Sequence, residues 1–319
     1  MSINNLQTMN KSDKVIIIKL SRFMRYTIRD LQGDFPDEAA CLDWLVNFLY
    51  PEGITCKVCD KVTKHHAMKT RKSYSCDECG HHVHPTAGTI FHKSRTPLTS
   101  WFYAVYLMST NKAGTSAKQI ERELGVTYKT AWRMMHQIRT MMDATDEQLS
   151  GVVEVDETYV HANTFKRSSA RKRYGFDARR TGQIVFGIVQ RGGMVKVWHV
   201  QSSGTRTLVP LIKEHVKRGT RVHSDGYGAY QKLDLWGYPH ETTNHGQGQY
   251  VDGDNYTQNI ENVWSHLKRG IKGVYRHIGP KYVQAYANEF AWRYSYRNHP
   301  SMFWSLMSRV SSETPSSKP

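Results

Sequence analysis

GVVEVDETYV, residues 151–160, decides the fold of the second half of this 319-residue chain. Its β-branched residues predict a strand, and alternation divides the side chains between two faces, with Val153, Val155 and Glu157 on one and Glu154, Asp156 and Thr158 on the other. A charge inside a sheet must be paired or bind metal. The run therefore predicts a metal-binding centre or, alternatively, an edge strand whose acids are solvated.

The residues around this stretch predict the rest of an α/β domain. QIVFGIVQ (183–190) and MVKVWHVQ (194–201) are strand-like, and the Arg-Gly-Gly between them is typical of a hairpin. Farther along the chain, the pattern predicts helices at 205–219, 257–272 and 280–297, and short strands at 220–225 and 240–245.

Two further acids extend the metal hypothesis. Asp225 ends the strand 220–225 just before Gly-Tyr-Gly, and Glu261 lies on the helix 257–272. Two carboxylates from adjacent strands and one from a helix can hold two divalent cations about 3.5–4 Å apart, and oxygen ligands favour Mg²⁺ or Mn²⁺. Lys268 shares a side of the helix with Glu261, next to the apolar stripe in which Trp264 is expected to pack.

The first half of the chain contains two pairs of cysteines. Cys56 and Cys59, then Cys76 and Cys79, have two residues within each pair and 16 between the pairs. This spacing predicts a structural Zn²⁺ site, because four thiolates leave no open position for catalysis. Cys41 is outside the pattern and is interpreted as a buried residue of a helix over 36–51.

Residues 115–142 predict a pair of helices that turn at Gly125. Helix-turn-helix proteins present the first residues of the second helix to DNA bases, which here are Thr127, Tyr128, Lys129 and Thr130, with Arg133 one turn on. The alternative is a pair of helices that only pack together.

The charge of the chain favours a polyanionic partner. The net charge is +16 and the isoelectric point about 9.6. Basic residues cluster at 166–180, and those interpreted as phosphate contacts are Lys166, Arg167, Arg171, Lys172 and Arg173. The alternative for this segment is a solvated, mobile loop. No run of 18 apolar residues indicates a membrane span, and paired cysteines without a secretory signal fit a reducing cytoplasm.

The order of these motifs, ending in VEVDETYV, HSDGYGAY and NIENVWSHLKR, resembles the DDE transposases of bacterial insertion sequences, in the zinc-ribbon (ISXO-type) branch. The resemblance covers residues 36–300. It implies that Asp156, Asp225 and Glu261 are the catalytic, metal-binding acids and that Lys268 is the basic residue that often follows the third. In this family the third position can also be Asn, and Asn259 and Asn262 flank Glu261 here.

The resemblance also implies metal-dependent cleavage at the terminal inverted repeats of an element, followed by strand transfer into target DNA. The expected partners are double-stranded DNA, both element ends and target, and other copies of the chain in a homodimer or higher oligomer. The expected location is the bacterial cytoplasm, at the nucleoid. Two alternatives are a DNA-binding regulator with an inactive domain and a ribonuclease-H-like nuclease that cuts without joining.

The predicted fold is a multidomain α+β protein. Its expected parts are a basic, helical N-terminal region (1–53), a zinc ribbon (54–92), a helix-turn-helix region (93–145), an α/β ribonuclease-H-like catalytic domain (150–300) and a C-terminal tail (301–319).

Overall fold

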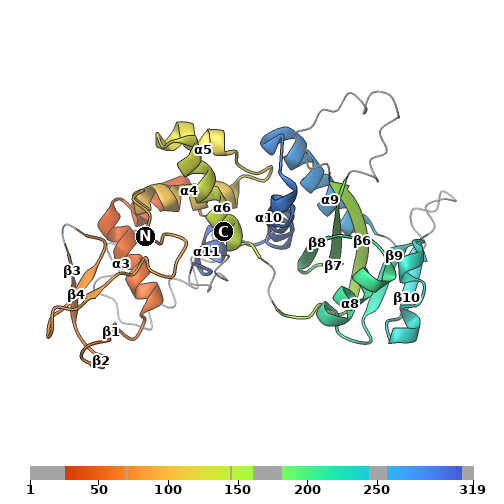
Figure 1. The fold of residues 1–319 in the computed structure, drawn as a ribbon, viewed down its shortest axis with the longest axis horizontal. Coiled ribbons are helices and arrows are strands. Elements are labelled where there is room, and N and C mark those ends of the chain that lie inside the picture. Colours follow the sequence, from red (N-terminus) through yellow and green to blue (C-terminus); the bar gives the residue numbers. More distant parts are fainter. Residues whose placement is uncertain (1–25, 69–70, 144–145, 161–181, 244–256, 311–319) are drawn as a thin grey trace. The chain divides into compact units, whose positions relative to one another are not determined.

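A computed structural model describes residues 26–68, 71–143, 146–160, 182–243 and 257–310 (Figure 1). The chain divides into two compact units. The N-terminal unit comprises Met1–Asn111, Ala117–Met141 and His299–Pro319, and the sheet unit comprises Lys112–Ser116 and Met142–Asn298. None of the described helices is long and apolar enough to cross a membrane.

The N-terminal unit consists of helices and a small β region (Figure 1). Its elements are α2 (Ile28–Asp34), α3 (Glu38–Leu49), β1 (Thr55–Cys56), β2 (Lys61–Val62), β3 (His65–Ala67), β4 (Tyr74–Cys76), β5 (His82–Val83), α4 (Leu98–Thr110), α5 (Ala117–Leu124), α6 (Tyr128–Thr140) and α11 (Met302–Met307). The sequence does not predict α2, although Thr27 and Asp30 form a capping box at its start.

Helix α11 completes the core of the N-terminal unit. The sequence predicts a tail from residue 301, but Phe303 is fully buried, stacks on Tyr26 with ring centroids 4.8 Å apart and lies 6.3 Å from the ring of Phe35. Phe35 in turn meets Phe102 of α4 edge-on at 4.7 Å. Aromatic burial of this kind stabilises a small core strongly, so residues 302–307 belong to the folded unit.

The sheet unit contains one five-stranded mixed sheet with helices on both faces. Its main elements are β6 (Val152–Val160), β7 (Gln183–Gln190), β8 (Val195–Val200), α8 (Thr205–His215), β9 (Arg221–Asp225), β10 (His240–Thr243), α9 (Gln258–Gly270) and α10 (Val283–Ser295), with short helical turns at Gly228–Tyr230, Asp234–Trp236, Ile271–Tyr275 and Pro280–Tyr282. The strand order is β10-β9-β6-β7-β8. Strands β6, β7 and β8 are antiparallel neighbours, while β9 runs parallel to β6 and β10 parallel to β9.

Each face of the sheet has its own core. Helices α9 and α10 cover one face and α8 covers the other (Figure 1). Val185, Val189 and Val197 pack with α9 and α10, and Val153, Val155 and Phe186 pack with α8. Strand β6 is therefore an inner strand, covered on both faces. The acids of residues 154–157 are not the solvated acids of an edge strand.

Candidate active site and zinc centre

Asp156 and Asp225 lie on neighbouring parallel strands. The register pairs Val153 with Val222 and Glu154 with His223. Asp156 lies two residues after Glu154, and Asp225 lies two residues after His223. Burial, together with the charges of Glu157 and Asp225, raises the pKa of Asp156 to about 7. Carboxylates that repel one another in a partly dry site are suited to bind a cation, which removes the repulsion.

Glu157 adds a third acid near this pair, on the opposite face of β6. Burial and the charge of Asp225 raise its pKa to about 7, while a hydrogen bond from the Tyr230 hydroxyl, 2.5 Å from Glu157 Oε2, acts in the other direction. Asp225 itself accepts a 3.0 Å hydrogen bond from the backbone N–H of Tyr227, in the turn after β9. The sequence pattern alone indicates no role for Glu157.

Trp264 of α9 contacts Asp156 directly. Its indole Nε1 donates a 2.8 Å hydrogen bond to Asp156 Oδ2, and the ring is 4% exposed, so it packs in the core as predicted. The ring fits because Asp156 pairs across β6 and β7 with Gly187, where an added Cβ would lie 2.6 Å from Trp264 Cη2 and 2.9 Å from Ile260 Cδ1. The absent side chain at position 187 thus makes room for the indole.

Glu154 is fully buried on the same face of β6 as Asp156. It accepts four hydrogen bonds, from Arg191 Nε, from Asn259 Nδ2 and from the backbone N–H groups of Asn259 and Ile260. The sequence placed Glu154 on this face but did not identify its partners. A signal was present, because a carboxylate in an inner strand requires donors, but their positions could not be read from the sequence.

Glu261 lies in the first turn of α9 and is exposed. Its Oε1 accepts a hydrogen bond from Thr257 Oγ1 at 3.1 Å, and Lys268, also exposed, lies in the last turn of the helix. Among the described residues, only the four zinc-ribbon cysteines bring three or more ligand atoms within 4.8 Å of one another. The structure therefore brings Asp156 and Asp225 to neighbouring strands and Glu261 to the adjoining helix, without gathering all three carboxylates to that distance.

The two flanking asparagines differ in their surroundings. Asn259 uses its Nδ2 for Glu154 and its Oδ1 for the Tyr294 hydroxyl, 3.2 Å away. Asn262 is exposed. Asn259 is thereby committed to the fold, whereas Glu261 and Asn262 are both exposed.

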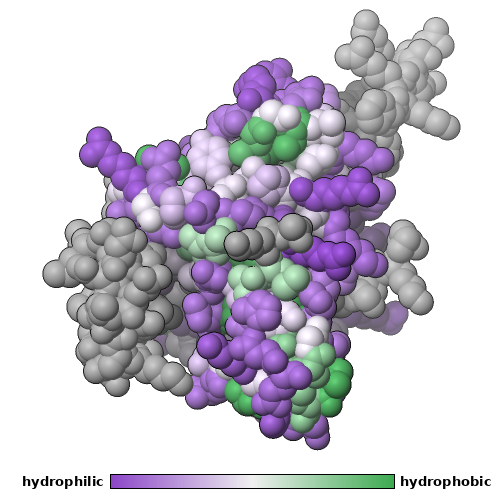
Figure 2. Space-filling model, turned by 90° about the vertical axis from the view of Figure 1, so that its left-hand side faces the viewer, coloured by the Kyte–Doolittle hydropathy of each residue, from purple (hydrophilic) through white to green (hydrophobic). Residues whose placement is uncertain are grey.

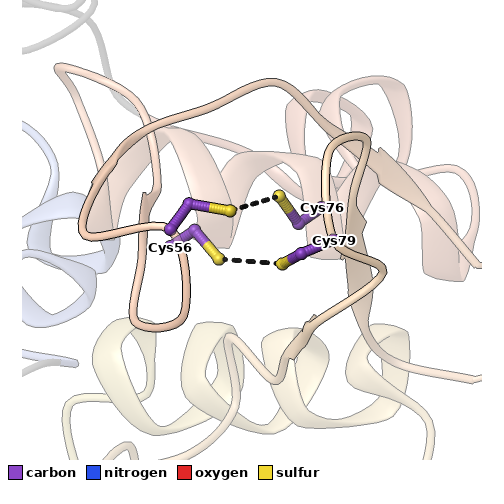
Figure 3. A group of neighbouring side chains, drawn as sticks. Cys56, Cys76 and Cys79 are labelled. Atoms are coloured by element: carbon purple, nitrogen blue, oxygen red, sulfur yellow. Dashed lines mark hydrogen bonds between the residues drawn. The ribbon is translucent and has the colours of Figure 1, made fainter.

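The four predicted zinc ligands form one group. Cys56 Sγ lies 3.5 Å from Cys79 Sγ, and Cys59 Sγ lies 3.9 Å from Cys76 Sγ, and Figure 3 shows the labelled side chains turned toward a common centre. Sulfurs around a tetrahedral Zn²⁺ are about 3.8 Å apart. A hydrogen bond with Thr63 Oγ1 lowers the pKa of the Cys76 thiol to about 6, which favours the thiolate that zinc requires. The donor set fits a structural zinc ion, and Cys41, fully buried on α3, is outside it.

The predicted helix pair is present as α5 and α6. Gly125 has a φ of +64° at the turn, and Thr127 caps α6 by accepting a hydrogen bond from the Thr130 N–H. Among the predicted DNA-contacting residues, Thr127, Tyr128, Lys129 and Arg133 are exposed and Thr130 is half-buried. Hydrophilic side chains dominate the face of the molecule in Figure 2. The predicted phosphate contacts at Lys166, Arg167, Arg171, Lys172 and Arg173 lie outside the described residues.

A mixed sheet of this strand order, with acids on two neighbouring parallel strands and a helix laid across them, defines a ribonuclease-H-like domain. Residues 148–295 match the model of the ISXO2-like transposase domain, and residues 36–82 match the transposase zinc-ribbon domain. The chain belongs to the IS1595/ISXO2-like DDE transposases that have an N-terminal zinc ribbon. The transposase domain implies an enzyme that acts on DNA and catalyses phosphodiester cleavage and strand transfer.

Comparison with known proteins finds the following similarities. An uncharacterized transposase-like protein of Haemophilus influenzae is 33% identical over 101 residues, 32% of this chain and 78% of that protein. An uncharacterized protein in transposable element ISH50 of Halobacterium salinarum is 27% identical over 267 residues, 79% of this chain and 90% of that protein. A chain in the cryo-EM structure of the simian T-cell lymphotropic virus intasome with the PP2A regulatory subunit B56 gamma is 12% identical. The match covers 68% of this chain and 76% of that chain, with a TM-score of 0.29.

Proposed function

We propose that this transposase binds the terminal inverted repeats of an insertion sequence, cleaves the DNA there and joins the 3′ end to target DNA. The observation that carries the proposal is the placement of Asp156 and Asp225 on two neighbouring parallel strands, where burial and the charges of Glu157 and Asp225 raise the pKa of Asp156 to about 7. Such an arrangement costs stability in the metal-free protein, and its chemistry is that of a cation site.

The proposed catalytic groups are Asp156, Asp225 and Glu261, with Lys268 on the same side of α9 as Glu261. When bound, two Mg²⁺ or Mn²⁺ ions would supply the positive charge that activates the attacking oxygen and stabilises the leaving oxygen. Asp156 would present the carboxylate oxygen not used by Trp264, and Asp225 would present the one not held by the Tyr227 N–H. Lys268 would pair with a DNA phosphate.

The proposed DNA-binding surface begins in the N-terminal unit. Tyr128 is exposed at the start of α6, where the second helix of a helix-turn-helix meets base edges, and the adjoining exposed Lys129 would hold a DNA phosphate. Arg133, one turn on, is held by a 3.3 Å hydrogen bond from its Nη2 to the His92 carbonyl, which would leave the rest of its guanidinium for phosphate. The 166–173 cluster would add contacts that do not depend on sequence. Because two element ends must be brought together, we infer a dimer or higher oligomer on DNA.

A strand-transfer assay tests this function. Labelled element ends, a target plasmid and Mg²⁺ are incubated with the protein and with its Asp156→Asn and Asp225→Asn variants. We expect joined product with the wild-type protein and none with either variant, while all three shift the labelled DNA equally in a gel. Cleavage without joining would indicate a nuclease, and a gel shift without cleavage would indicate a regulator. A variant that still cuts would refute the assignment of its acid.

A further inference from the structure

Glu154 is a buried acid next to the proposed catalytic residues, and its carboxylate contacts the start of helix α9 and Arg191. We propose that Glu154 is a positioning residue, which anchors the start of α9 on β6 and so sets Glu261 and Trp264 relative to Asp156. The inference rests on the function proposed above and names a residue that acts through α9, without contact with substrate.

The contacts of Glu154 use both of its oxygens. Oε2 accepts hydrogen bonds from the backbone N–H groups of Asn259 and Ile260, at 2.8 and 3.1 Å. Oε1 accepts from Asn259 Nδ2 at 2.8 Å and from Arg191 Nε at 2.9 Å. Glu154 itself has no exposed surface. A buried carboxylate with four donors is fully compensated, and it holds those donors in one arrangement.

Helix α9 needs this carboxylate because the side chain of its N-cap residue, Thr257, accepts no hydrogen bond from the N–H groups of the first turn. The first N–H groups of a helix lack partners within the helix, and an N-cap Ser or Thr usually accepts from one of them. Here Thr257 makes no such bond, and its hydroxyl donates instead to Glu261 Oε1. Glu154, 105 residues earlier in the chain, satisfies two of the N–H groups, and its negative charge lies at the positive end of the helix dipole.

Two anchors therefore connect β6 with α9. Glu154 holds the first turn, and Asp156, two residues along the same face of β6, accepts the hydrogen bond of Trp264 one turn farther on. The apolar core already holds α9 on the sheet, and the two hydrogen-bonded positions define which residues of the helix face β6. Glu261 lies between the anchored positions, so its distance from Asp156 is set by them.

The test compares Glu154→Gln with Glu289→Gln. Whichever way the new amide at position 154 turns, its NH₂ group would face N–H donors. Glu289 is a matched control, because it is also fully buried in the sheet unit and also binds an arginine, Arg293, at 2.7 Å, while it accepts a further hydrogen bond from the Tyr275 hydroxyl, beyond the end of α9. Both variants lose a buried ion pair, so both should lower the unfolding temperature.

Three measurements separate positioning from stability. In hydrogen exchange of the metal-free protein, Glu154→Gln should release the amides at the start of α9, whereas Glu289→Gln should not. In calorimetry with Mn²⁺, Glu154→Gln should weaken binding about tenfold or more, as for other groups that orient metal ligands, while Glu289→Gln stays within twofold of wild type. In the cleavage assay at saturating DNA, the Mg²⁺ concentration for half-maximal rate should rise in Glu154→Gln alone.

The possible failures are distinguishable. If wild-type protein shows no Mn²⁺ binding that Asp156→Asn removes, the proposed function is wrong. If wild-type protein binds Mn²⁺ through Asp156 and Glu154→Gln binds it equally well, the positioning role is wrong and the function stands. Equal weakening in Glu154→Gln and Glu289→Gln would also overturn it, because the effect would then reflect stability alone.

Discussion

The indole Nε1 of Trp264 lies 2.8 Å from Asp156 Oδ2 and donates a hydrogen bond to it. This bond joins the helix of the third proposed acid to the strand of the first. It also favours the ionised form of Asp156, so it lowers a pKa that burial and the neighbouring acids raise. A core tryptophan thus influences the charge of the proposed catalytic carboxylate.

Replacing Trp264 with Phe should shift the pH dependence of cleavage. Without the N–H donor, the pKa of Asp156 rises further above 7, and the acidic limb of the pH–rate profile should move up by about one pH unit. The measurement is the rate at fixed Mg²⁺ across pH 6–9. An unchanged acidic limb would show that Asp156 ionisation does not limit the reaction.

The Asp156→Asn variant should be more stable than wild type when divalent metal is absent and the pH is high. The pKa of Asp156 in the folded protein is about 7, above its ordinary value of 3.8. The wild-type protein therefore loses stability as the pH rises between these two values. At pH 8 the free energy of unfolding of Asp156→Asn should exceed that of wild type by on the order of 3 kcal/mol. The difference should shrink toward pH 5. Denaturant unfolding at both pH values measures it, and equal gains at the two would contradict the shift.

Gly187→Ala should destabilise the sheet unit by about 1–3 kcal/mol, because the new Cβ would overlap Trp264 and Ile260. Gly273→Ala is the control, since a Cβ there meets nothing within 4 Å. Thermal unfolding measures both. Adding Trp264→Phe to Gly187→Ala removes the overlapping part of the indole, so the double variant should lose less stability than the sum of the two single variants.

The purified protein should contain one zinc ion per chain, measured by elemental analysis. Cys76→Ser should lose the ion and unfold the zinc ribbon, whereas Cys41→Ala should retain it, because Cys41 lies buried on α3 away from the four-sulfur group. Full zinc content in Cys76→Ser would remove that residue from the ligand set.

Lys129→Ala should weaken binding to DNA of any sequence and reduce the slope of log affinity against log salt by about 0.9, the loss of one phosphate contact. Lys213→Ala serves as the control, because Lys213 lies in the last turn of α8 in the sheet unit, with its ammonium 4.7 Å from the centre of the Trp236 ring. Binding titrations at several salt concentrations give the slopes. Identical slopes for Lys129→Ala and wild type would exclude Lys129 from the interface.

The parts of this molecule that the sequence predicts are those encoded by local spacing. The paired cysteines, the turn at Gly125 and the β-branched run around Asp156 each have a short-range pattern, and all three appear as folded elements. The expectation that Asp225 lies near Asp156 comes from the order of the motifs and the family resemblance, whereas the parallel pairing of their strands is seen in the structure.

The parts that could not be predicted depend on contacts between distant residues. No local pattern pairs Glu154 with Asn259, since the contact depends on how α9 crosses the sheet. The role of Gly187 likewise depends on Trp264, which is 77 residues away by number and adjacent in space. Helix α11 is short and follows a polar segment, so its burial beside Tyr26 and Phe35 is apparent only in three dimensions.

That last contact has a consequence for how the protein is made. A ribosome that has completed residue 298 has produced every residue of the sheet unit, while the N-terminal unit still lacks α11. Until α11 emerges, the apolar surface that receives Phe303 and Leu306 is uncovered and exposed to chaperones and proteases. A stop codon at this point would keep all the proposed catalytic acids and still inactivate the element, through misfolding of the half that carries the zinc ribbon.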